Sequence, residues 1–373
     1  MKTLNGIDNT ESLTILKGKK LGLITNPTGM NAMLRSTAEI LKADYDLCAV
    51  YGPEHGIRGD QQAGIGVQQA EYDEELGVRC FSLYGKTRRP TPEMLEGIEM
   101  MVYDIQDVGA RFYTYIYTLA YAMEECAKAG IPVTILDRVN PLGGDITEGI
   151  LLNPVLHSFV GEYPIPSRYG LTVGEFARYI NDTQHIGCEL NVIPCLGWNR
   201  SMLYDETGLP WIMPSPNIPT LESALVYIGT CLFEGTDLSE GRGTTHPFEL
   251  IGAPQLDASR LAKELNAIQL PGLLWRAVHF TPTFSKHQGE LCHGVQLHIT
   301  DKKCFRPFEA GLYLLDAIRQ QYPEIKMNNA LDRLLGDTTY RAGQETIQQL
   351  IARANTQSNV FLEATRQYWL YHQ

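Results

Sequence analysis

The chain of 373 residues has a formal net charge of −12 at neutral pH, and 44% of its residues are hydrophobic while 20% are charged. This length exceeds that of one ordinary domain, so we expect two domains with the composition of a globular protein. The negative charge argues against nucleic acid or an anionic membrane surface as the main partner. No segment approaches the roughly 18 consecutive apolar residues that a membrane span requires.

The first residues of the chain lack the apolar core of a signal peptide. We therefore expect a cytoplasmic protein, or a periplasmic or secreted one if a leader has been removed. The eight cysteines show no CxxC spacing, which favours structural thiols over disulfides. The sequence does not indicate the oligomeric state.

The first half of the sequence alternates between strand-like and helix-like stretches. We predict strands within 19–29, 45–56, 100–107 and 131–144, and helices within 33–43 and 114–130, with a further helix start near 91. The strands are almost continuously apolar, which is typical of a parallel sheet covered by helices on both faces. The sequence therefore predicts an α/β fold.

Polar side chains follow three of the predicted strands at the point where each strand ends. In parallel sheets the ligand crevice lies beyond the carboxyl ends of the strands, so we expect these side chains to share a cleft. For Asp104 and Asp137 alone, capping of a loop or helix is an equally good interpretation. The strand-end residues are Glu54, His55, Asp104, Asp107, Asp137, Arg138 and Asn140.

The common cofactor motifs are absent. No GxGxxG follows the first strand, and neither the nucleotide-binding P-loop nor the zinc-binding HExxH motif occurs. The GxSxG motif of serine hydrolases is also missing. His55, Asp107 and Asp137 could in principle bind a metal ion, but no two histidines have ligand spacing. We therefore predict no cofactor and no metal.

The pattern changes in the second half of the chain. Residues 234–249 are rich in glycine and charge, which indicates a shaped binding loop. Beyond Pro254, helices are predicted within 256–268, 307–323 and 359–373, and alternation within 294–300 predicts a strand. We predict a first domain at 1–253 and a smaller α+β domain at 254–373, with His287 on a loop that could reach the cleft.

The loop residues suit glycoside hydrolysis, which needs carboxyl groups at the scissile bond. Sugar binding also needs aromatic faces and planar hydrogen-bonding groups, and Arg111 and Tyr113 lie close to Asp107 in the sequence. The candidate carboxylates are Glu54, Asp107, Glu148, Glu234 and Glu240.

Several long motifs resemble those of one enzyme family, in the same order and from about residue 20 to the C-terminus. They are YGPEHGIRGD, SLYG, YDIQDVGARFYTYIYTL, LDRVNPLGG, MPSPNIPTLESALVY, GTCLFEGTDLSEGRGTTHPFELIGAP and FSKHQGELCHGVQLHITD. Together they resemble the exo-β-N-acetylmuramidases of the NamZ type.

This resemblance implies a Rossmann-like domain, a smaller C-terminal domain that closes the cleft, and release of N-acetylmuramic acid from the non-reducing end of peptidoglycan fragments. It implies a catalytic role for Glu54, and Glu148 or Glu240 as the second catalytic group. The sequence departs from the family pattern at Val139, Tyr169 and His246, and these differences bear on fine substrate preference. A carbohydrate-binding protein without activity and a metal-dependent hydrolase are the alternatives.

The expected substrate adds one requirement of its own. Muramic acid carries a lactyl carboxylate, which an arginine binds well through two parallel hydrogen bonds, so Arg58, Arg111 and Arg242 are candidates for selecting it. The 2-acetamido group of the substrate could itself act as the nucleophile. The predicted substrate-binding residues are His55, Arg58, Asp107, Arg111, Tyr113, Asn140, Asn217, Glu234, Arg242 and His287.

Overall fold

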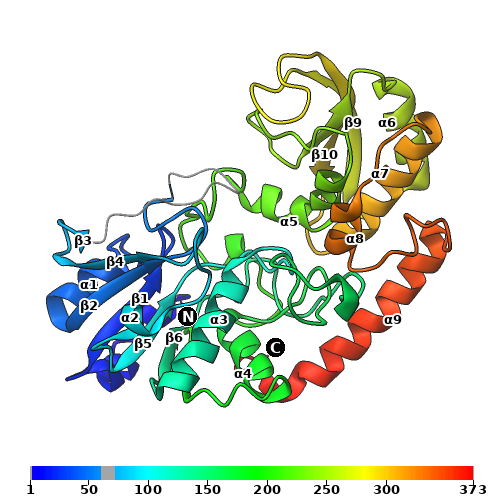
Figure 1. Cartoon of the computed structure of the whole chain (residues 1–373). Helices are drawn as coiled ribbons and strands as arrows, with labels where there is room; N and C mark the ends of the chain where they lie inside the picture. The colour runs from blue at the N-terminus through cyan, green and yellow to red at the C-terminus, as the bar shows by residue number, and fades with distance from the viewer. Residues whose placement is uncertain (1, 60–71, 373) are drawn as a thin grey trace.

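The computed structural model describes residues 2–59 and 72–372 of the chain. Figure 1 shows a larger unit built on one sheet and a smaller unit above it. Asp60, the last residue of the YGPEHGIRGD motif, lies outside the described residues.

The larger unit contains a seven-stranded sheet in the order β3-β4-β2-β1-β5-β6-β7. Its strands are β1 (Lys20–Thr25), β2 (Asp46–Gly52), β3 (Tyr72–Asp73), β4 (Val78–Ser82), β5 (Met100–Asp104), β6 (Val133–Leu136) and β7 (Leu190–Ile193). Six strands are parallel, and only the edge strand β3 pairs antiparallel with β4. Counted among themselves, the six parallel strands have the spatial order 3-2-1-4-5-6, which is that of a Rossmann fold. The predicted α/β class is therefore confirmed.

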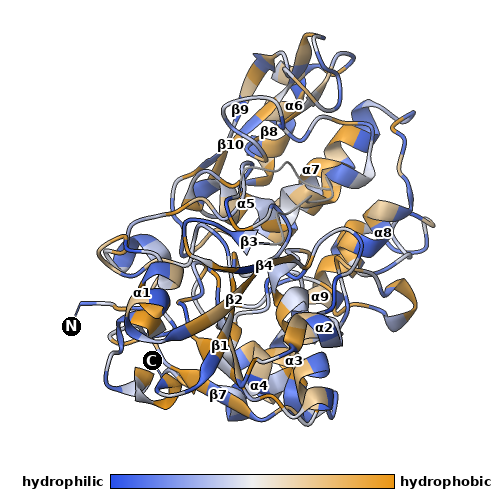
Figure 2. Ribbon diagram, turned by 60° about the vertical axis from the view of Figure 1, so that its left-hand side comes forward, coloured by the Kyte–Doolittle hydropathy of each residue, from blue (hydrophilic) through white to orange (hydrophobic). Residues whose placement is uncertain are grey.

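Both faces of this sheet are buried, because neighbouring residues of a strand point to opposite sides. Leu23 packs with Leu41 of α1 (Thr37–Asp44) on one face. Ile24 belongs to the opposite core with the apolar side of α3 (Tyr115–Ala129) and α4 (Val173–Thr183). The short α2 (Pro92–Leu95) precedes β5. Figure 2 shows β2 as mainly hydrophobic and α1 and α3 as mixed. The near-continuous apolar strands of the sequence are explained by this double covering.

The smaller unit has a three-stranded antiparallel sheet in the order β8-β10-β9. Its strands are β8 (Leu250–Ala253), β9 (Leu273–Phe280) and β10 (Cys292–Ile299), and its helices are α5 (Leu221–Thr230), α6 (Ala258–Ile268), α7 (Pro307–Gln321) and α8 (Asn329–Leu335). The last helix, α9 (Ile347–Thr365), runs back toward the larger unit, and the C-terminus lies beside α4 (Figure 1). Tyr371 there donates a hydrogen bond of 2.6 Å to the buried carboxylate of Asp137. The predicted boundary at 253/254 stays a prediction.

Two glycines allow α5 and α7 to cross closely. A Cβ atom added at Gly229 would lie 1.9 Å from the carbonyl oxygen of Pro307, and one at Gly311 would lie 2.4 Å from that of Gly229. We expect Gly229→Ala to lower the free energy of unfolding by about 1–3 kcal/mol or more, because the backbones must move apart. Urea unfolding measures this change, with Gln320→Ala on the exposed side of α7 as the control. Equal stability of the two variants would contradict the close crossing.

Candidate active site

A pocket opens beyond the carboxyl ends of β2 and β5 and is bounded on its other side by α5 and the loop that precedes β8. Its volume is about 610 Å³, part of which is open to solvent. This is the position at which parallel α/β sheets bind ligands. It is lined by Glu54, His55, Phe112, Tyr113, Thr114, Tyr115, Val160, Ser215, Asn217, Ile218, Tyr227, Cys231, Glu234, Arg242, Phe248 and Leu334.

Glu54 stands on a tight turn directly after β2. The amide of Gly56 closes this turn on the carbonyl oxygen of Pro53 at 2.9 Å. The hydroxyl of Thr114, just before α3, donates a hydrogen bond of 2.7 Å to Glu54 Oε2. Tyr84 contacts the same carboxylate, and burial together with the charge of Glu54 raises the pKa of Tyr84 to about 12. A stiff turn and two hydroxyl groups therefore hold the Glu54 carboxylate at the pocket, as a proton-transfer group requires.

His55 follows Glu54 in the turn and has a backbone φ of 70°. Few residues other than glycine adopt this left-handed conformation, and such positions are common at functional sites. The imidazole is buried and lines the pocket beside Glu54. The loop thus turns both side chains of the Glu-His pair toward the same pocket.

The opposite wall carries a chain of alternating charges. Arg242 Nη1 lies 2.6 Å from Glu234 Oε1 and 3.4 Å from Glu240 Oε1. On the far side of Glu240, Lys286 Nζ lies 2.9 Å from Oε2. Burial opposes the charge of Arg242, but the two carboxylates outweigh this effect and raise its pKa above the ordinary value. Arg242 and Glu234 line the pocket, whereas Glu240 supports Arg242 from behind.

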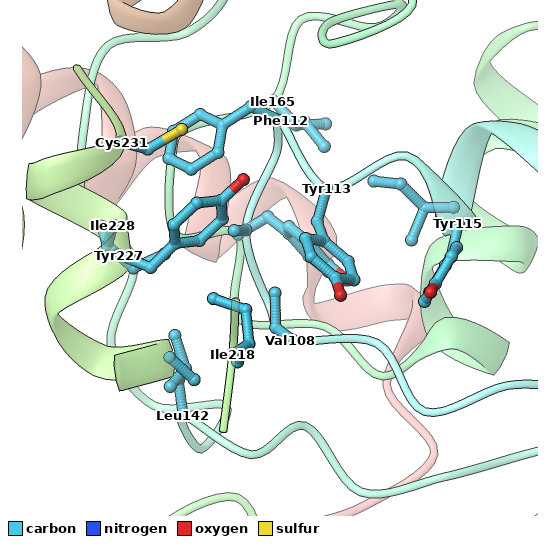
Figure 3. Close-up of a cluster of buried hydrophobic side chains, with 14 of the residues drawn as sticks. Val108, Phe112, Tyr113, Tyr115, Leu142, Ile165, Ile218, Tyr227, Ile228 and Cys231 are labelled. Atoms are coloured by element: carbon cyan, nitrogen blue, oxygen red, sulfur yellow. The ribbon is translucent and has the colours of Figure 1, made fainter. Parts of the chain in front are cut away.

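Aromatic rings from three segments of the chain form the floor of the pocket. Figure 3 shows Phe112 and Tyr113, from the loop before α3, facing Tyr227 of α5. Tyr227 meets Phe112 edge to face at a centroid distance of 5.1 Å and Phe248 at 4.6 Å. The guanidinium carbon of Arg242 lies 4.8 Å from the centroid of Phe248. This combination of aromatic faces and a few polar groups is typical of a pocket for a sugar-sized ligand.

The structure brings six of the predicted site residues together at the pocket and places the others elsewhere. The six are Glu54, His55, Tyr113, Asn217, Glu234 and Arg242. The predicted residues that do not line it are Arg58, Asp107, Arg111, Asn140, Glu148, Glu240 and His287.

Two of the three arginines considered for the lactyl group lie outside the pocket. Arg58 is exposed and lies 3.7 Å from the carboxylates of Asp73 and Glu75. Arg111 is fully buried and donates hydrogen bonds to the carbonyl oxygens of Arg333 and Leu334, at 3.1 and 2.6 Å. Its burial lowers its pKa to about 10. Arg111 therefore joins the two units of the fold.

Glu148 also joins the two units. Its Oε1 lies 2.8 Å from Arg168 Nη1, and its Oε2 accepts a hydrogen bond of 3.3 Å from the amide of Phe308 in the first turn of α7. All of these groups are buried. Burial raises the pKa of Glu148 despite the neighbouring Arg168. A carboxylate in this position stabilises the N-terminus of α7.

Asn140 and His287 likewise hold backbone segments in place. The Asn140 amide donates to the carbonyl oxygen of Leu171 at 2.9 Å and accepts from the amide of Leu142 at 3.0 Å. One imidazole nitrogen of His287 lies 2.8 Å from the carbonyl oxygen of Asp237.

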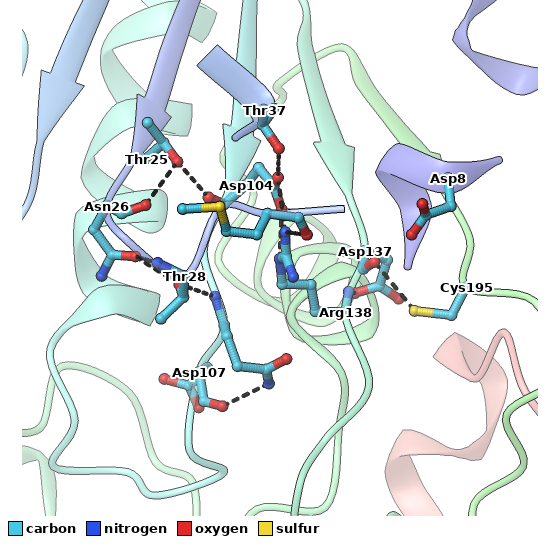
Figure 4. A network of polar contacts seen from close by, with 12 residues as sticks. Asp8, Thr25, Asn26, Thr28, Thr37, Asp104, Asp107, Asp137, Arg138 and Cys195 are labelled. Carbon is cyan, nitrogen blue, oxygen red and sulfur yellow. Dashed lines mark hydrogen bonds and ion pairs between the residues drawn. The ribbon is translucent and has the colours of Figure 1, made fainter. Parts of the chain in front are cut away.

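The strand-end residues Asp104, Arg138 and Asp137 form a separate polar network (Figure 4). Arg138 contacts both carboxylate oxygens of Asp104, at 2.5 and 2.9 Å. Asp137 accepts a hydrogen bond of 2.8 Å from the amide of Gly174, in the first turn of α4, and one of 2.7 Å from the hydroxyl of Thr172, the N-cap residue of α4. The interpretation as caps is therefore the correct one for Asp137, and Asp104 pairs with Arg138 beneath the loops.

Among residues 2–59 and 72–372, no group of three or more histidine, cysteine, aspartate or glutamate side chains could hold a metal ion. Over these same residues, no helix is both long enough and apolar enough to cross a bilayer.

Comparison with known proteins identifies the family. The sequence profile of the N-terminal domain of exo-β-N-acetylmuramidase NamZ matches residues 21–222, and that of its C-terminal domain matches residues 225–371. The chain belongs to the NamZ family. The junction of the two profiles lies at the start of α5, so Tyr227, Glu234, Arg242 and Phe248 fall within the C-terminal match.

Relatives agree with this assignment over nearly the whole chain. The peptidoglycan β-N-acetylmuramidase NamZ of Bacillus subtilis (strain 168) is 49% identical over 364 residues, which cover 95% of this chain and 88% of that protein. A crystal structure of a DUF1343 family protein from Bacteroides fragilis NCTC 9343 superposes with a TM-score of 0.92 at 36% identity, covering 100% of this chain and 99% of that chain. A second such protein from the same strain gives 0.81 at 29% identity, with both chains fully covered. The expected membership of this family is thereby confirmed.

The three departures from the family pattern lie outside the pocket. Val139 is buried and His246 lies 3.1 Å from Glu249 at the surface. Tyr169 is buried and donates a short hydrogen bond to Asp107 Oδ2, which also accepts from the amide of Gly109 at 2.7 Å. Any influence of Val139, Tyr169 and His246 on the pocket is therefore indirect and passes through the residues that support its walls.

Asp107 should make the stability of the protein depend on pH. Burial raises its pKa to about 7, although hydrogen bonds from Tyr169 and Gly109 oppose this effect. The folded protein then keeps a proton that the unfolded chain releases near pH 4, so the free energy of unfolding falls as the pH rises from about 4 to about 7. The expected slope is at most about 1.4 kcal/mol per pH unit.

Asp107→Asn should flatten this slope, because asparagine has no proton to release. Urea unfolding at pH 5 and pH 8 measures the change for both proteins. Asp137, whose pKa burial raises to about 6, adds a similar slope that remains in the variant. If the free energy of unfolding fell equally between pH 5 and pH 8 in wild type and Asp107→Asn, a protonated Asp107 in the folded protein would be contradicted.

Sequence reasoning missed four polar residues around the pocket. Thr114 and Tyr84 contact Glu54, Ser215 lines the pocket, and Lys286 holds Glu240. Lys286 also donates to the carbonyl oxygens of Phe233 and Leu238, at 2.7 and 3.0 Å. Tyr84 and Lys286 stand in the SLYG and FSKHQG motifs, so the unusual motifs contained the signal that could have found them.

Proposed function

We propose that this chain is an exo-β-N-acetylmuramidase that removes N-acetylmuramic acid from the non-reducing end of peptidoglycan fragments. Membership of the NamZ family and the 49% identity to the B. subtilis enzyme support the activity. The single structural observation that carries the proposal is the position of Glu54 at an aromatic pocket that also contains Arg242.

Glu54 is the group that gives a proton to the glycosidic oxygen. Its partners Thr114 and Tyr84 each contribute a hydroxyl group. Because a hydroxyl can both donate and accept a hydrogen bond, it can orient a carboxyl group whether that group is protonated or ionised. Glu234 and Glu240 are instead paired with Arg242 and Lys286, so their charges serve to hold cations. Glu148 is buried against Arg168 outside the pocket. Of the three carboxylates considered for catalysis, the arrangement therefore favours Glu54 as the proton donor.

The second catalytic group is supplied by the substrate. Because Glu148 and Glu240 lie outside the pocket lining, the 2-acetamido group of N-acetylmuramic acid is the better candidate for attack on the anomeric carbon. Asn217 and Tyr113 line the same pocket and can hydrogen-bond this group and neighbouring hydroxyls. The aromatic floor formed by Phe112, Tyr227 and Phe248 excludes water from the sugar ring.

Arg242 selects the lactyl carboxylate. Among the three arginines considered, it alone lines the pocket. Its Nη1 is held by Glu234 and Glu240, which fixes the plane of the guanidinium group, and Phe248 supports one face. The remaining N–H groups can then form parallel hydrogen bonds with a carboxylate, which N-acetylglucosamine lacks.

The activity is tested with para-nitrophenyl β-N-acetylmuramide and the corresponding N-acetylglucosaminide, each with and without a chelator. We expect hydrolysis of the muramide alone and no effect of the chelator. Binding without hydrolysis would favour the carbohydrate-binding alternative, and loss of activity with the chelator would favour a metal-dependent hydrolase.

A further inference from the structure

An exposed arginine lies beside the catalytic pocket on an aromatic support. The guanidinium carbon of Arg88 lies 3.9 Å from the ring centroid of Phe159 and 6.0 Å from that of Tyr84. The two rings are themselves 5.9 Å apart. Tyr84 contacts Glu54, and Phe159 precedes Val160, which lines the pocket. Arg88 therefore borders the pocket on the side of the proposed proton donor.

Arg88 and its neighbour Arg89 differ in whether their charge is paired with a carboxylate. Arg89 lies 2.5 Å from Glu124 and 3.2 Å from Glu125. No ion pair joins Arg88 to any carboxylate in the part of the chain that the structure describes, and its side chain is exposed. A guanidinium group held over the face of a ring can still offer N–H groups to a planar oxyanion.

The position of Glu54 indicates which part of the substrate meets Arg88. A proton donor acts on the oxygen that joins the released sugar to the rest of the fragment, so groups outside the pocket next to Glu54 face the leaving part. In peptidoglycan the first sugar of this leaving part is N-acetylglucosamine, which is neutral. The second is another N-acetylmuramic acid, whose lactyl group can carry a carboxylate.

We propose that Arg88, supported by Phe159, binds the lactyl carboxylate of the second sugar beyond the cleaved bond. This inference rests on the proposed function and extends it to the leaving part of the substrate. A charge at the rim accelerates association with an anionic partner and is screened by salt. Arg88 would thus make the enzyme favour fragments that continue with a muramic acid.

The test compares the kcat/KM values of three substrates. They are the disaccharide N-acetylmuramyl-N-acetylglucosamine, the trisaccharide that continues with N-acetylmuramic acid, and the same trisaccharide with its reducing-end lactyl group amidated. We expect Arg88→Gln to lower kcat/KM for the acidic trisaccharide by about 3- to 30-fold, as expected for one partly exposed charged hydrogen bond. The disaccharide and the amidated trisaccharide should be unaffected, Arg88→Lys should restore part of the rate, and 0.5 M salt should reduce the advantage of the acidic substrate.

Arg89→Gln is the matched control, because its charge is already paired with Glu124 and Glu125. Equal rates of wild type and Arg88→Gln on the acidic trisaccharide would overturn the inference, and so would an equal loss on all three substrates. A failure of the proposed function would look different: the wild type would release no N-acetylmuramic acid from any of the three substrates. In that case the inference about Arg88 would fall together with the proposed function.

Discussion

Replacing Glu54 with glutamine is expected to lower kcat for hydrolysis of a β-N-acetylmuramide by about 10²–10⁴-fold, the contribution typical of general acid catalysis. Glutamine has nearly the same shape as glutamate and can still accept the hydrogen bond from Thr114, but it cannot supply a proton. KM should change little, because binding depends on the aromatic floor and Arg242. Steady-state kinetics with para-nitrophenyl β-N-acetylmuramide measures both constants.

Glu148→Gln is the control for this variant, since Glu148 was also considered for catalysis. Its carboxylate is buried against Arg168 and the first turn of α7, so its replacement leaves Arg168 without its counter-ion. We expect a loss of about 3–5 kcal/mol in the free energy of unfolding with kcat largely retained in the folded fraction. Retained kcat in Glu54→Gln together with lost kcat in Glu148→Gln would reverse the two assignments.

Replacing Arg242 with alanine is expected to abolish the preference for the muramide over the glucosaminide. Truncating one partner of a buried charge pair costs about 2–5 kcal/mol, which corresponds to a loss of roughly 30- to several-thousand-fold in kcat/KM for the muramide. The glucosaminide has no lactyl carboxylate and should lose much less. The ratio of the two kcat/KM values is therefore the quantity to measure.

Two variants separate this role of Arg242 from a general disturbance of the pocket. Arg242→Lys keeps the charge next to Glu234 and Glu240 but has no planar fork, so it should restore only part of the preference. Arg58→Ala removes an exposed arginine outside the pocket and should leave the preference unchanged. An unchanged preference in Arg242→Ala would contradict the selection of the lactyl group by this residue.

The sheet of the larger unit was predictable because its signal is local. Continuous apolar runs that end in polar residues predicted β1, β2, β5 and β6, and helical spacing with a final glycine predicted α3, whose C-cap Gly130 has a φ of 67°. The short strands β3 and β4 and the strand β7 were not predicted. The last predicted helix begins at residue 359, whereas α9 begins at Ile347. The helical turns that were not predicted, residues 347–358, are rich in glutamine and asparagine. Only a narrow stripe of this part of α9, which includes Leu350 and Ala354, is buried.

The site was predictable only in part, because neighbouring polar residues have different partners. Glu54 and Asp107 both follow a strand, yet one lines the pocket and the other is buried under Tyr169. Arg111 donates hydrogen bonds to the carbonyl oxygens of Arg333 and Leu334, which lie 222 and 223 positions later in the chain. Such long-range partners leave no local pattern, so sequence reasoning could not separate residues that face the ligand from residues that join the two units.

The central claim, that the chain releases N-acetylmuramic acid from a non-reducing end, is tested most directly with two isomeric disaccharides. The protein is incubated with N-acetylmuramyl-β-1,4-N-acetylglucosamine and with N-acetylglucosaminyl-β-1,4-N-acetylmuramic acid, and the products are identified by mass spectrometry. We expect equimolar free sugars from the first disaccharide and none from the second. Cleavage of the second alone, or of neither, would contradict the proposed function.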